Sequence, residues 1–172
     1  HAEYVAEMVR QMIYAQYGGE AYTRGLNVYT TLNAADQDTA YKALRRGIMD
    51  YERRQIYRGP EKFITLPQNA KELDEAIDDV LLEHPDNGDL MSAVVTEVNA
   101  KKIVALRGDG KNIEITGEGL RPVQSGLSDK APPNIRIRPG AVIRVAQTPK
   151  NTWEATQLPE VEGAFVAMDP RN

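Results

Sequence analysis

The chain has 172 residues, a formal net charge of −4 and no cysteine, a composition that fits either a reducing or an oxidising compartment. No apolar run approaches the roughly 20 residues that a membrane-spanning helix needs, and no secretory leader pattern opens the sequence. The only two histidines lie far apart in sequence, so we expect neither a metal site nor a cofactor.

Residues 4–17 predict an amphipathic helix, because their apolar side chains recur at helical spacing. This stripe consists of Tyr4, Val5, Met8, Val9, Met12, Ile13 and Tyr17. Gly18 and Gly19 end the helix. From Leu26 to Leu32 apolar and polar residues alternate, which predicts a half-buried strand.

A longer helix is predicted from the N-cap residue Asn33 to about Ile56. Its expected buried side is formed by Ala40, Leu44, Ile48 and Tyr51. It also has a basic flank, which suits solvated arginines or contact with anionic glycan or lipid headgroups. This flank consists of Arg45, Arg46, Arg53, Arg54 and Arg58. Gly59 and Pro60 break the helical pattern, so we place a domain boundary there.

The next predicted helix begins after the cap residue Asn69 and ends at His84, which precedes a proline. Its apolar stripe consists of Leu73, Ala76, Ile77, Val80 and Leu81. Residues 61–91 hold two lysines and nine acidic residues, so the opposite face is either simply solvated or a docking surface for a basic partner. The candidate docking residues are Asp74, Asp78, Asp79 and Glu83. Residues 86–89 resemble a calcium loop but lack its bidentate glutamate, which favours a turn.

Strand patterns then dominate. Alternating or β-branched runs occur at residues 92–99, 102–107, 112–116, 141–147 and 151–157. An irregular connection rich in glycine, proline and serine separates the third run from the fourth, and five short strands in this arrangement fit a small barrel of the oligonucleotide/oligosaccharide-binding (OB) type. Trp153 is expected to pack rather than to stack a sugar or a base, and a basic strip of Arg136, Arg138 and Arg144 is conceivable on one face. Exposed aromatic residues are not interleaved with this strip, so nucleic acid is not expected as a partner.

The last apolar run, Ala164 to Met168, predicts a strand buried on both faces. Asp169 and Pro170 then begin a turn, which predicts a further strand beyond residue 172 and therefore a longer parent protein. Because the ends of an insertion lie close together, we expect this strand to pair with Leu26–Leu32 in one sheet.

Two motifs carry a family resemblance. The segment Leu26-Asn27-Val28-Tyr29-Thr30-Thr31-Leu32-Asn33 and the segment Val161-Glu162-Gly163-Ala164-Phe165-Val166-Ala167-Met168-Asp169-Pro170 resemble sequences of the class A penicillin-binding proteins, the bifunctional peptidoglycan synthases of bacterial cell walls. In that family the first motif opens the transpeptidase domain and the second starts its main sheet. The catalytic S-x-x-K, S-x-N and K-T-G motifs are absent, and the nearest candidate, Ser125 to Lys130, has the wrong spacing, so no catalytic residue is assigned.

The resemblance implies an α+β fold in which a small OB-like antiparallel barrel is inserted between pieces of a transpeptidase domain, with two to three flanking amphipathic helices. Residues 1–58 would form a linker helix, a transpeptidase-type strand and a long helix. Residues 59–158 would form the insertion, and residues 159–172 the start of the transpeptidase sheet.

The implied role is non-catalytic docking, in the periplasm, within an inner-membrane-anchored synthase. The implied partner is an outer-membrane lipoprotein activator or another cell-wall synthesis protein. The alternatives are direct binding of peptidoglycan glycan, which would need exposed aromatic residues, and an OB-type nucleic-acid-binding protein.

Overall fold

The computed structural model describes residues 2–171, which fall into two compact units. One unit comprises residues up to Met49 together with the segment from Glu162 onward. It holds the helix α1 (Glu3–Tyr17), the short 3-10 helix η1 (Gly18–Tyr22) and most of the helix α2 (Ala34–Glu52). The other unit, Asp50–Val161, contains all the strands that the structure describes.

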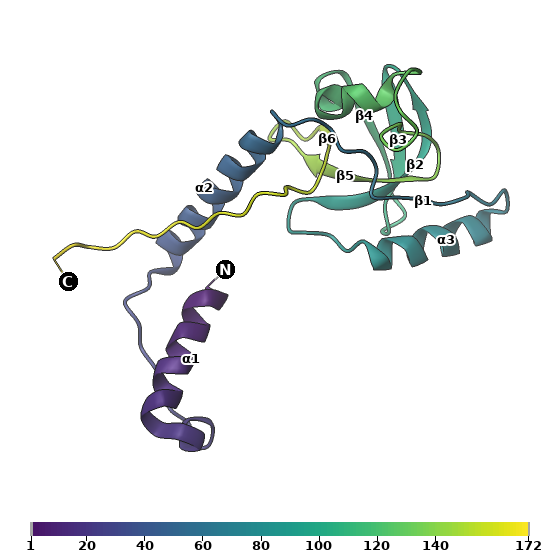
Figure 1. Cartoon of the computed structure of the whole chain (residues 1–172). Coiled ribbons are helices and arrows are strands. Elements are labelled where there is room, and N and C mark those ends of the chain that lie inside the picture. The colour runs from purple at the N-terminus through teal and green to yellow at the C-terminus, as the bar shows by residue number, and fades with distance from the viewer. Residues whose placement is uncertain (1, 172) are drawn as a thin grey trace. The chain divides into compact units, whose positions relative to one another are not determined.

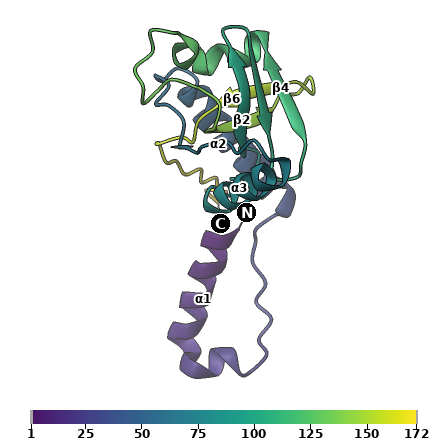
Figure 2. The ribbon, with the colours of Figure 1, turned by 90° about the vertical axis from the view of Figure 1, so that its right-hand side faces the viewer.

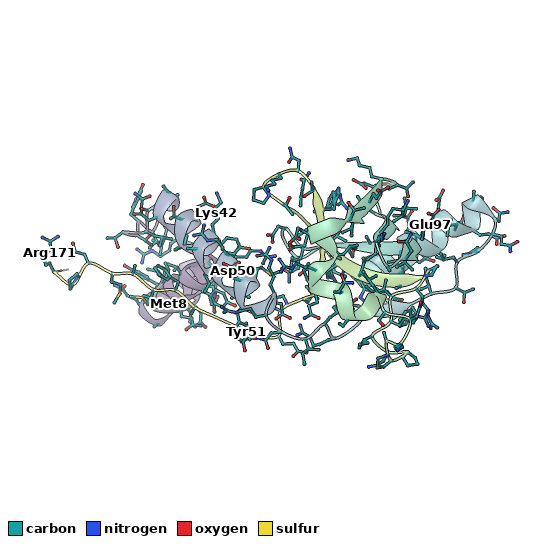
Figure 3. The ribbon with its side chains drawn as sticks, turned by 90° about the horizontal axis from the view of Figure 1, so that it is seen from above. Met8, Lys42, Asp50, Tyr51, Glu97 and Arg171 are labelled. Atoms are coloured by element: carbon teal, nitrogen blue, oxygen red, sulfur yellow. The ribbon has the colours of Figure 1, made fainter. Side chains whose placement is uncertain are left out.

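Helix α1 confirms the helix that the apolar stripe predicts. It ends at Gly18, whose positive φ of 55° suits a residue without a Cβ. None of its residues is buried, and Met8 is one of several large apolar side chains that it leaves exposed (Figure 3). The ring of Tyr14 in α1 and the ring of Tyr22 at the end of η1 have centroids 5.8 Å apart.

Helix α2 begins as predicted at the Asn33 cap, whose side-chain oxygen accepts hydrogen bonds from the amides of Ala35 (2.9 Å) and Asp36 (3.3 Å). The predicted end at Ile56 is wrong. The helix stops at Glu52, because the next amides bond three residues back instead of four, as in Gln55 N–H to Glu52 O at 2.9 Å. The predicted buried position Tyr51 is 42 % exposed, and Figure 3 labels it near this end of the helix.

Two predicted strands do not form. Leu26–Leu32 and Ala164–Met168 are both extended chain without a sheet partner, and both are exposed. Alternation specifies which face of a strand is buried, but a strand exists only where neighbouring chains satisfy its backbone groups. The residue just before the second segment lies against α2, since a Cβ on Gly163 would lie 3.1 Å from Leu44 Cδ1. The predicted pairing of these two segments in one sheet is therefore wrong in this structure.

The second unit is built on one antiparallel sheet with a helix, α3 (Ala70–Glu83), beside it (Figure 1). Its strands run in the spatial order β1-β5-β2-β3-β4, and β6 pairs with the remaining length of β5. The strands are β1 (Lys62–Phe63), β2 (Met91–Asn99), β3 (Lys102–Leu106), β4 (Asn112–Thr116), β5 (Ala141–Gln147) and β6 (Trp153–Thr156). The five predicted strand runs are all present within one or two residues, and only the two-residue β1 has no counterpart in the sequence prediction.

The predicted antiparallel OB-like architecture is confirmed, with one difference in detail. Within residues 2–171 no hydrogen-bonded ladder joins β4 to β6, so the sheet does not close into a complete barrel. Figure 2 shows β2, β4 and β6 above α3 at the end of the sheet. A register shift between Val95 and Glu97 marks a bulge in β2, a feature that increases the bend of a strand.

The core lies mainly on one side of this sheet. The alternating burial of β4, with Ile113 and Ile115 inside, shows the two-residue period that the sequence predicts. The segment from Gly117 to Gly140, predicted to be irregular, begins with a 3-10 helical stretch, η2 (Gly117–Leu127). This stretch carries Leu120, Val123 and Leu127 into the main core.

A smaller apolar cluster joins α3 to the sheet. Ile77, Val80 and Leu81 pack with Val94 of β2 and Val142 of β5. The helix is capped as predicted, because Asn69 accepts a hydrogen bond from the Lys71 amide, and it ends at His84. One face of α3 is thereby fixed, and the opposite face lies in solvent.

Candidate functional site

The four candidate docking residues all lie on the solvent face of α3. Asp74, Asp78, Asp79 and Glu83 are exposed, while Ile77 and Val80 between them are buried. This separation follows from helical periodicity, since residues three and four apart share a face. The structure therefore brings the four carboxylates to one surface of a helix that is packed firmly on its other side.

Glu83 differs from the other three. Lys62 of β1 forms an ion pair with it, and the hydrogen bond from this lysine holds the pKa of Glu83 below its ordinary value. In the part of the chain that the structure describes, Asp74, Asp78 and Asp79 have no lysine or arginine within ion-pair distance. These three aspartates, which we call the acidic row, are the uncompensated part of the candidate surface.

A second charged cluster lies at the end of α3, and the sequence did not predict that its members would meet. Arg144 of β5 is only 4 % exposed and forms a bidentate contact with Glu61, with N···O distances of 2.6 and 2.9 Å. Arg144 also donates to the Pro85 carbonyl at 2.7 Å, and the His84 ring nitrogen Nδ1 lies 2.8 Å from Glu61. Burial alone would raise the pKa of Glu61, but the Arg144 and His84 contacts outweigh burial and lower it.

This cluster borders a hollow of about 530 Å³ that is lined mainly by residues 83–88. Its loop forms a turn, as predicted. Asp86 accepts a hydrogen bond from the Ser92 amide at 2.8 Å, and Gly88 has a φ of 64°. Within residues 2–171 no group of three or more metal-ligating side chains is arranged to hold an ion. The same residues contain no helix that is long and apolar enough to cross a bilayer.

A third cluster joins the two chain connections at the edge of the second unit. Glu52, at the end of α2, has a side chain that is only 2 % exposed, and the Arg58 guanidinium lies 2.6 Å from it. Gln157 donates to the same carboxylate at 2.7 Å and accepts from the Arg58 amide at 2.9 Å. Arg58 also donates to the Leu158 carbonyl at 2.6 Å and pairs with Glu160 at 3.1 Å.

We call this group of Glu52, Arg58, Gln157, Leu158 and Glu160 the clasp. It fastens the incoming chain to the outgoing chain, because Arg58 bonds to Gln157 and Leu158, which lie about 100 residues further along the sequence. The basic flank predicted from sequence includes Arg58, but no local pattern could reveal that its partners lie at Glu52 and Gln157.

The aromatic residues do not form a broad platform on the sheet. Trp153 is partly buried and packs against the main core, as expected, with the Arg107 guanidinium 5.8 Å from its ring centre. Tyr57 is buried and Tyr41 partly buried, whereas Tyr51 is exposed at the end of α2. The other exposed tyrosines all belong to the other unit, and they are Tyr4, Tyr14, Tyr17, Tyr22 and Tyr29.

The basic strip imagined for Arg136, Arg138 and Arg144 does not exist. Arg144 is buried against Glu61, Arg136 pairs with Asp129 at 2.9 Å, and Arg138 lies over the Phe63 ring at 4.4 Å. The three guanidinium groups therefore have three separate environments.

Comparison with known proteins identifies the family to which this chain belongs. The family model described as "Penicillin-binding protein OB-like domain" matches residues 57–161, which are nearly the whole of the sheet-containing unit. The chain belongs to this penicillin-binding protein OB-like domain family. The resemblance seen in the two terminal motifs is thus confirmed by the part of the chain between them.

Relatives match the chain over almost its whole length. It is 36 % identical over 171 residues to penicillin-binding protein 1A of Neisseria lactamica and 34 % identical over 177 residues to penicillin-binding protein 1A of Escherichia coli K12. Each alignment covers 99 % of this chain but 21 % of the relative, so the chain spans about a fifth of the length of these proteins.

Two solved structures are similar to this chain. The crystal structure of penicillin-binding protein 1A from Haemophilus influenzae is 27 % identical, matches 92 % of this chain and 22 % of its own, and has a TM-score of 0.72. A domain of the penicillin-binding protein MrcA from Nitrosomonas europaea is 39 % identical over 61 % of this chain and 100 % of its own, with a TM-score of 0.41.

Proposed function

We propose that this chain is the non-catalytic docking part of a peptidoglycan synthase, which receives a regulatory protein partner during cell-wall synthesis. The parent would be anchored in the inner membrane, with this part in the periplasm. The partner would be an outer-membrane lipoprotein activator or another cell-wall synthesis protein. Family membership supports the link to a synthase, and the surface of α3 supports docking.

The observation that carries the proposal is the acidic row. Its three aspartates have no ion-pair partner among residues 2–171, and they stand on a helix whose other side is fixed by Ile77, Val80 and Leu81. Charges on such a rigid surface steer a partner of opposite charge and mainly raise the rate of association. A basic surface on the partner is therefore the expected complement.

The clasp supports a regulatory consequence of docking. Because Glu52 and Arg58 of the incoming connection bond to Gln157 and Leu158 of the outgoing one, a force or rotation imposed on the sheet-containing unit would reach both connections together. Docking would then bias the parent between two states through a differential interaction with each of them.

Direct binding of peptidoglycan glycan is the alternative. Stacking on sugars needs exposed aromatic faces, and in the sheet-containing unit Trp153 and Tyr57 are engaged in the core. The exposed tyrosines Tyr22 and Tyr29 keep the alternative open for the other unit. A pull-down with isolated peptidoglycan sacculi, compared between the wild type and a Tyr22→Ala/Tyr29→Ala variant, tests it. Loss of sacculus binding in the variant would favour the glycan.

The absence of catalysis has its own test. Without an S-x-x-K serine, the chain should not be acylated by a β-lactam. A fluorescent penicillin that remained covalently attached to the purified chain would refute this part of the proposal.

The docking proposal is tested by charge reversal. The variant Asp74→Lys/Asp78→Lys/Asp79→Lys should associate with a purified lipoprotein activator at least about tenfold more slowly at low salt, and the difference should shrink as salt rises. The matched control, Glu97→Lys/Glu114→Lys/Glu118→Lys, makes the same change in net charge at exposed positions of the sheet-containing unit. Equal association rates for the two variants would show that only total charge matters and that the acidic row is a solvated helix surface.

A further inference from the structure

Arg138 is an exposed arginine that has no carboxylate partner in the described part of the chain. Its side chain makes no hydrogen bond or ion pair with any residue in the described range 2–171. Its guanidinium carbon lies 4.4 Å from the centre of the Phe63 ring. By contrast Arg136, two residues earlier, is paired with Asp129 at 2.9 Å.

Stacking on a ring fixes the guanidinium without using its donors. The cation–π contact uses the flat face of the guanidinium. The N–H donors lie in the plane of the guanidinium and can donate hydrogen bonds to both oxygens of a carboxylate. Phe63 itself packs against the main core, so the ring that supports Arg138 is anchored. Arg138 is in this way held ready for an anionic group before any ligand arrives.

A mostly apolar hollow lies beside this arginine. It has a volume of about 460 Å³ and is lined by Phe63, Ile64, Thr65, Leu66, Arg138 and Pro139. Ile64 and Leu66 are held against the cluster beneath α3. A fixed hollow of this lining fits an aliphatic side chain, with one cation at its rim.

The backbone along the hollow is also unsatisfied. β1 stands at the end of the sheet and pairs, among the described strands, only with β5. The chain continues beyond it as extended backbone, and the amides of Thr65 and Leu66 make no hydrogen bond to any described residue. Unpaired backbone at the edge of a sheet is the group to which an extended peptide adds.

Gly140 holds this edge in place. Its φ is 86°, and a Cβ at this position would lie 2.0 Å from the Ile64 carbonyl oxygen, while the Ile64 amide donates to the Gly140 carbonyl at 2.9 Å. Only glycine permits this close approach.

We propose that Arg138, Phe63 and the segment Ile64–Leu66 form a second docking site, which takes an extended peptide segment of a protein partner. The peptide would present a glutamate or aspartate to Arg138 and an aliphatic side chain to the hollow. This inference does not depend on the acidic row, whose expected partner surface has the opposite charge. A lipid headgroup or a free anion would satisfy Arg138 alone and leave the hollow and the edge amides unused.

The test uses the full 172-residue chain, labelled with nitrogen-15, and a blocked model peptide, acetyl-Thr-Val-Glu-Val-Thr-amide. Titration should shift the amide resonances of Phe63, Ile64, Thr65, Leu66, Arg138 and Gly140. The same peptide with glutamine in place of glutamate should bind about tenfold more weakly, since a charge-assisted hydrogen bond is lost. This peptide comparison is made on the wild-type protein and needs no protein variant.

Two variants then test whether Arg138 is the residue that binds the glutamate of the peptide. Arg138→Gln should weaken the glutamate peptide about tenfold and make the two peptides bind alike, whereas Arg136→Gln should leave both affinities unchanged. Thermal unfolding of each variant checks the fold.

Four results would each overturn the proposal. They are no shift at Phe63–Leu66 at millimolar peptide, equal binding of the glutamate and glutamine peptides by the wild type, the same shifts from acetate alone, and shifts produced by phosphatidylglycerol vesicles but not by the peptide. The last two would assign Arg138 to a free anion or to a lipid surface.

Discussion

Replacing Arg58 should destabilise the sheet-containing unit far more than replacing Glu52. The two side chains of the clasp differ in burial, because Glu52 is 2 % exposed and Arg58 is 32 % exposed. Arg58→Met would leave the Glu52 carboxylate buried with Gln157 as its remaining donor. An uncompensated buried charge of this kind costs about 2–4 kcal/mol, near the lower end of values for broken buried pairs because Gln157 stays.

Glu52→Gln should cost only about 1 kcal/mol, since the half-exposed Arg58 keeps Glu160, the Leu158 carbonyl and water as partners. In the double variant, Arg58→Met no longer leaves a buried carboxylate without its cation, because residue 52 is already neutral. The two changes should therefore be non-additive, with a coupling energy of about 1–3 kcal/mol.

Urea unfolding followed by Trp153 fluorescence measures these values, because this only tryptophan of the chain lies in β6 of the same unit. With a slope of about 2 kcal/mol per molar urea, Arg58→Met should lower the midpoint by about 1–2 M. The control is Arg121→Met, which breaks the exposed pair with Glu118 and should cost about 0–1 kcal/mol. Equal losses for Arg58→Met and Arg121→Met would refute the reasoning and show that water already solvates Glu52.

Three further predictions concern the same unit. Because the pKa of Glu61 is lowered in the folded state, its carboxylate stabilises the fold above the unfolded pKa of 4.5, and this stabilisation is lost as the pH falls below that value. Glu61→Gln should therefore make the urea midpoint change less between neutral and acidic pH. Parallel pH profiles for the variant and the wild type would contradict this. Tyr57→Phe should be neutral or stabilising by up to about 1 kcal/mol in thermal unfolding, because the buried Tyr57 hydroxyl has no hydrogen-bond partner among the described residues, and a clear loss of stability would reveal one. Gly126→Ala should cost about 1–3 kcal/mol, since its Cβ would lie 2.7 Å from the Ile135 carbonyl oxygen and 2.8 Å from the Tyr57 ring, whereas Gly108→Ala, whose nearest neighbour would be 3.6 Å away, should unfold like the wild type.

Local patterns were sufficient to predict most of this fold. The cap at Asn69, the apolar stripe of α3 and the alternation along β4 are each encoded within a few residues, and the structure reproduces them. The 3-10 stretch η2 was missed, because glycine and proline around Leu120 and Val123 obscure their spacing. β1 has only two residues, too few for any period to show.

Contacts between distant residues were not predictable in this way. The clasp joins Arg58 to Gln157, and the cluster beside α3 joins Glu61 to Arg144, across intervals in which nothing marks one residue as the partner of the other. The strand predicted at Leu26–Leu32 does not form for a related reason. Its apolar and polar residues do alternate, but alternation does not supply the neighbouring strand that would pair with it.

Because of the clasp, the residues between Arg58 and Gln157 can be replaced as one piece. Since the Arg58 amide and the Gln157 side chain are 2.9 Å apart, the intervening residues form a closed loop that leaves and rejoins the chain at nearly one point. A few glycines could bridge that point, so the loop could be excised, or replaced by the equivalent loop of a relative, with little disturbance to the flanking segments. One such loop could therefore be exchanged for another without altering the chain on either side.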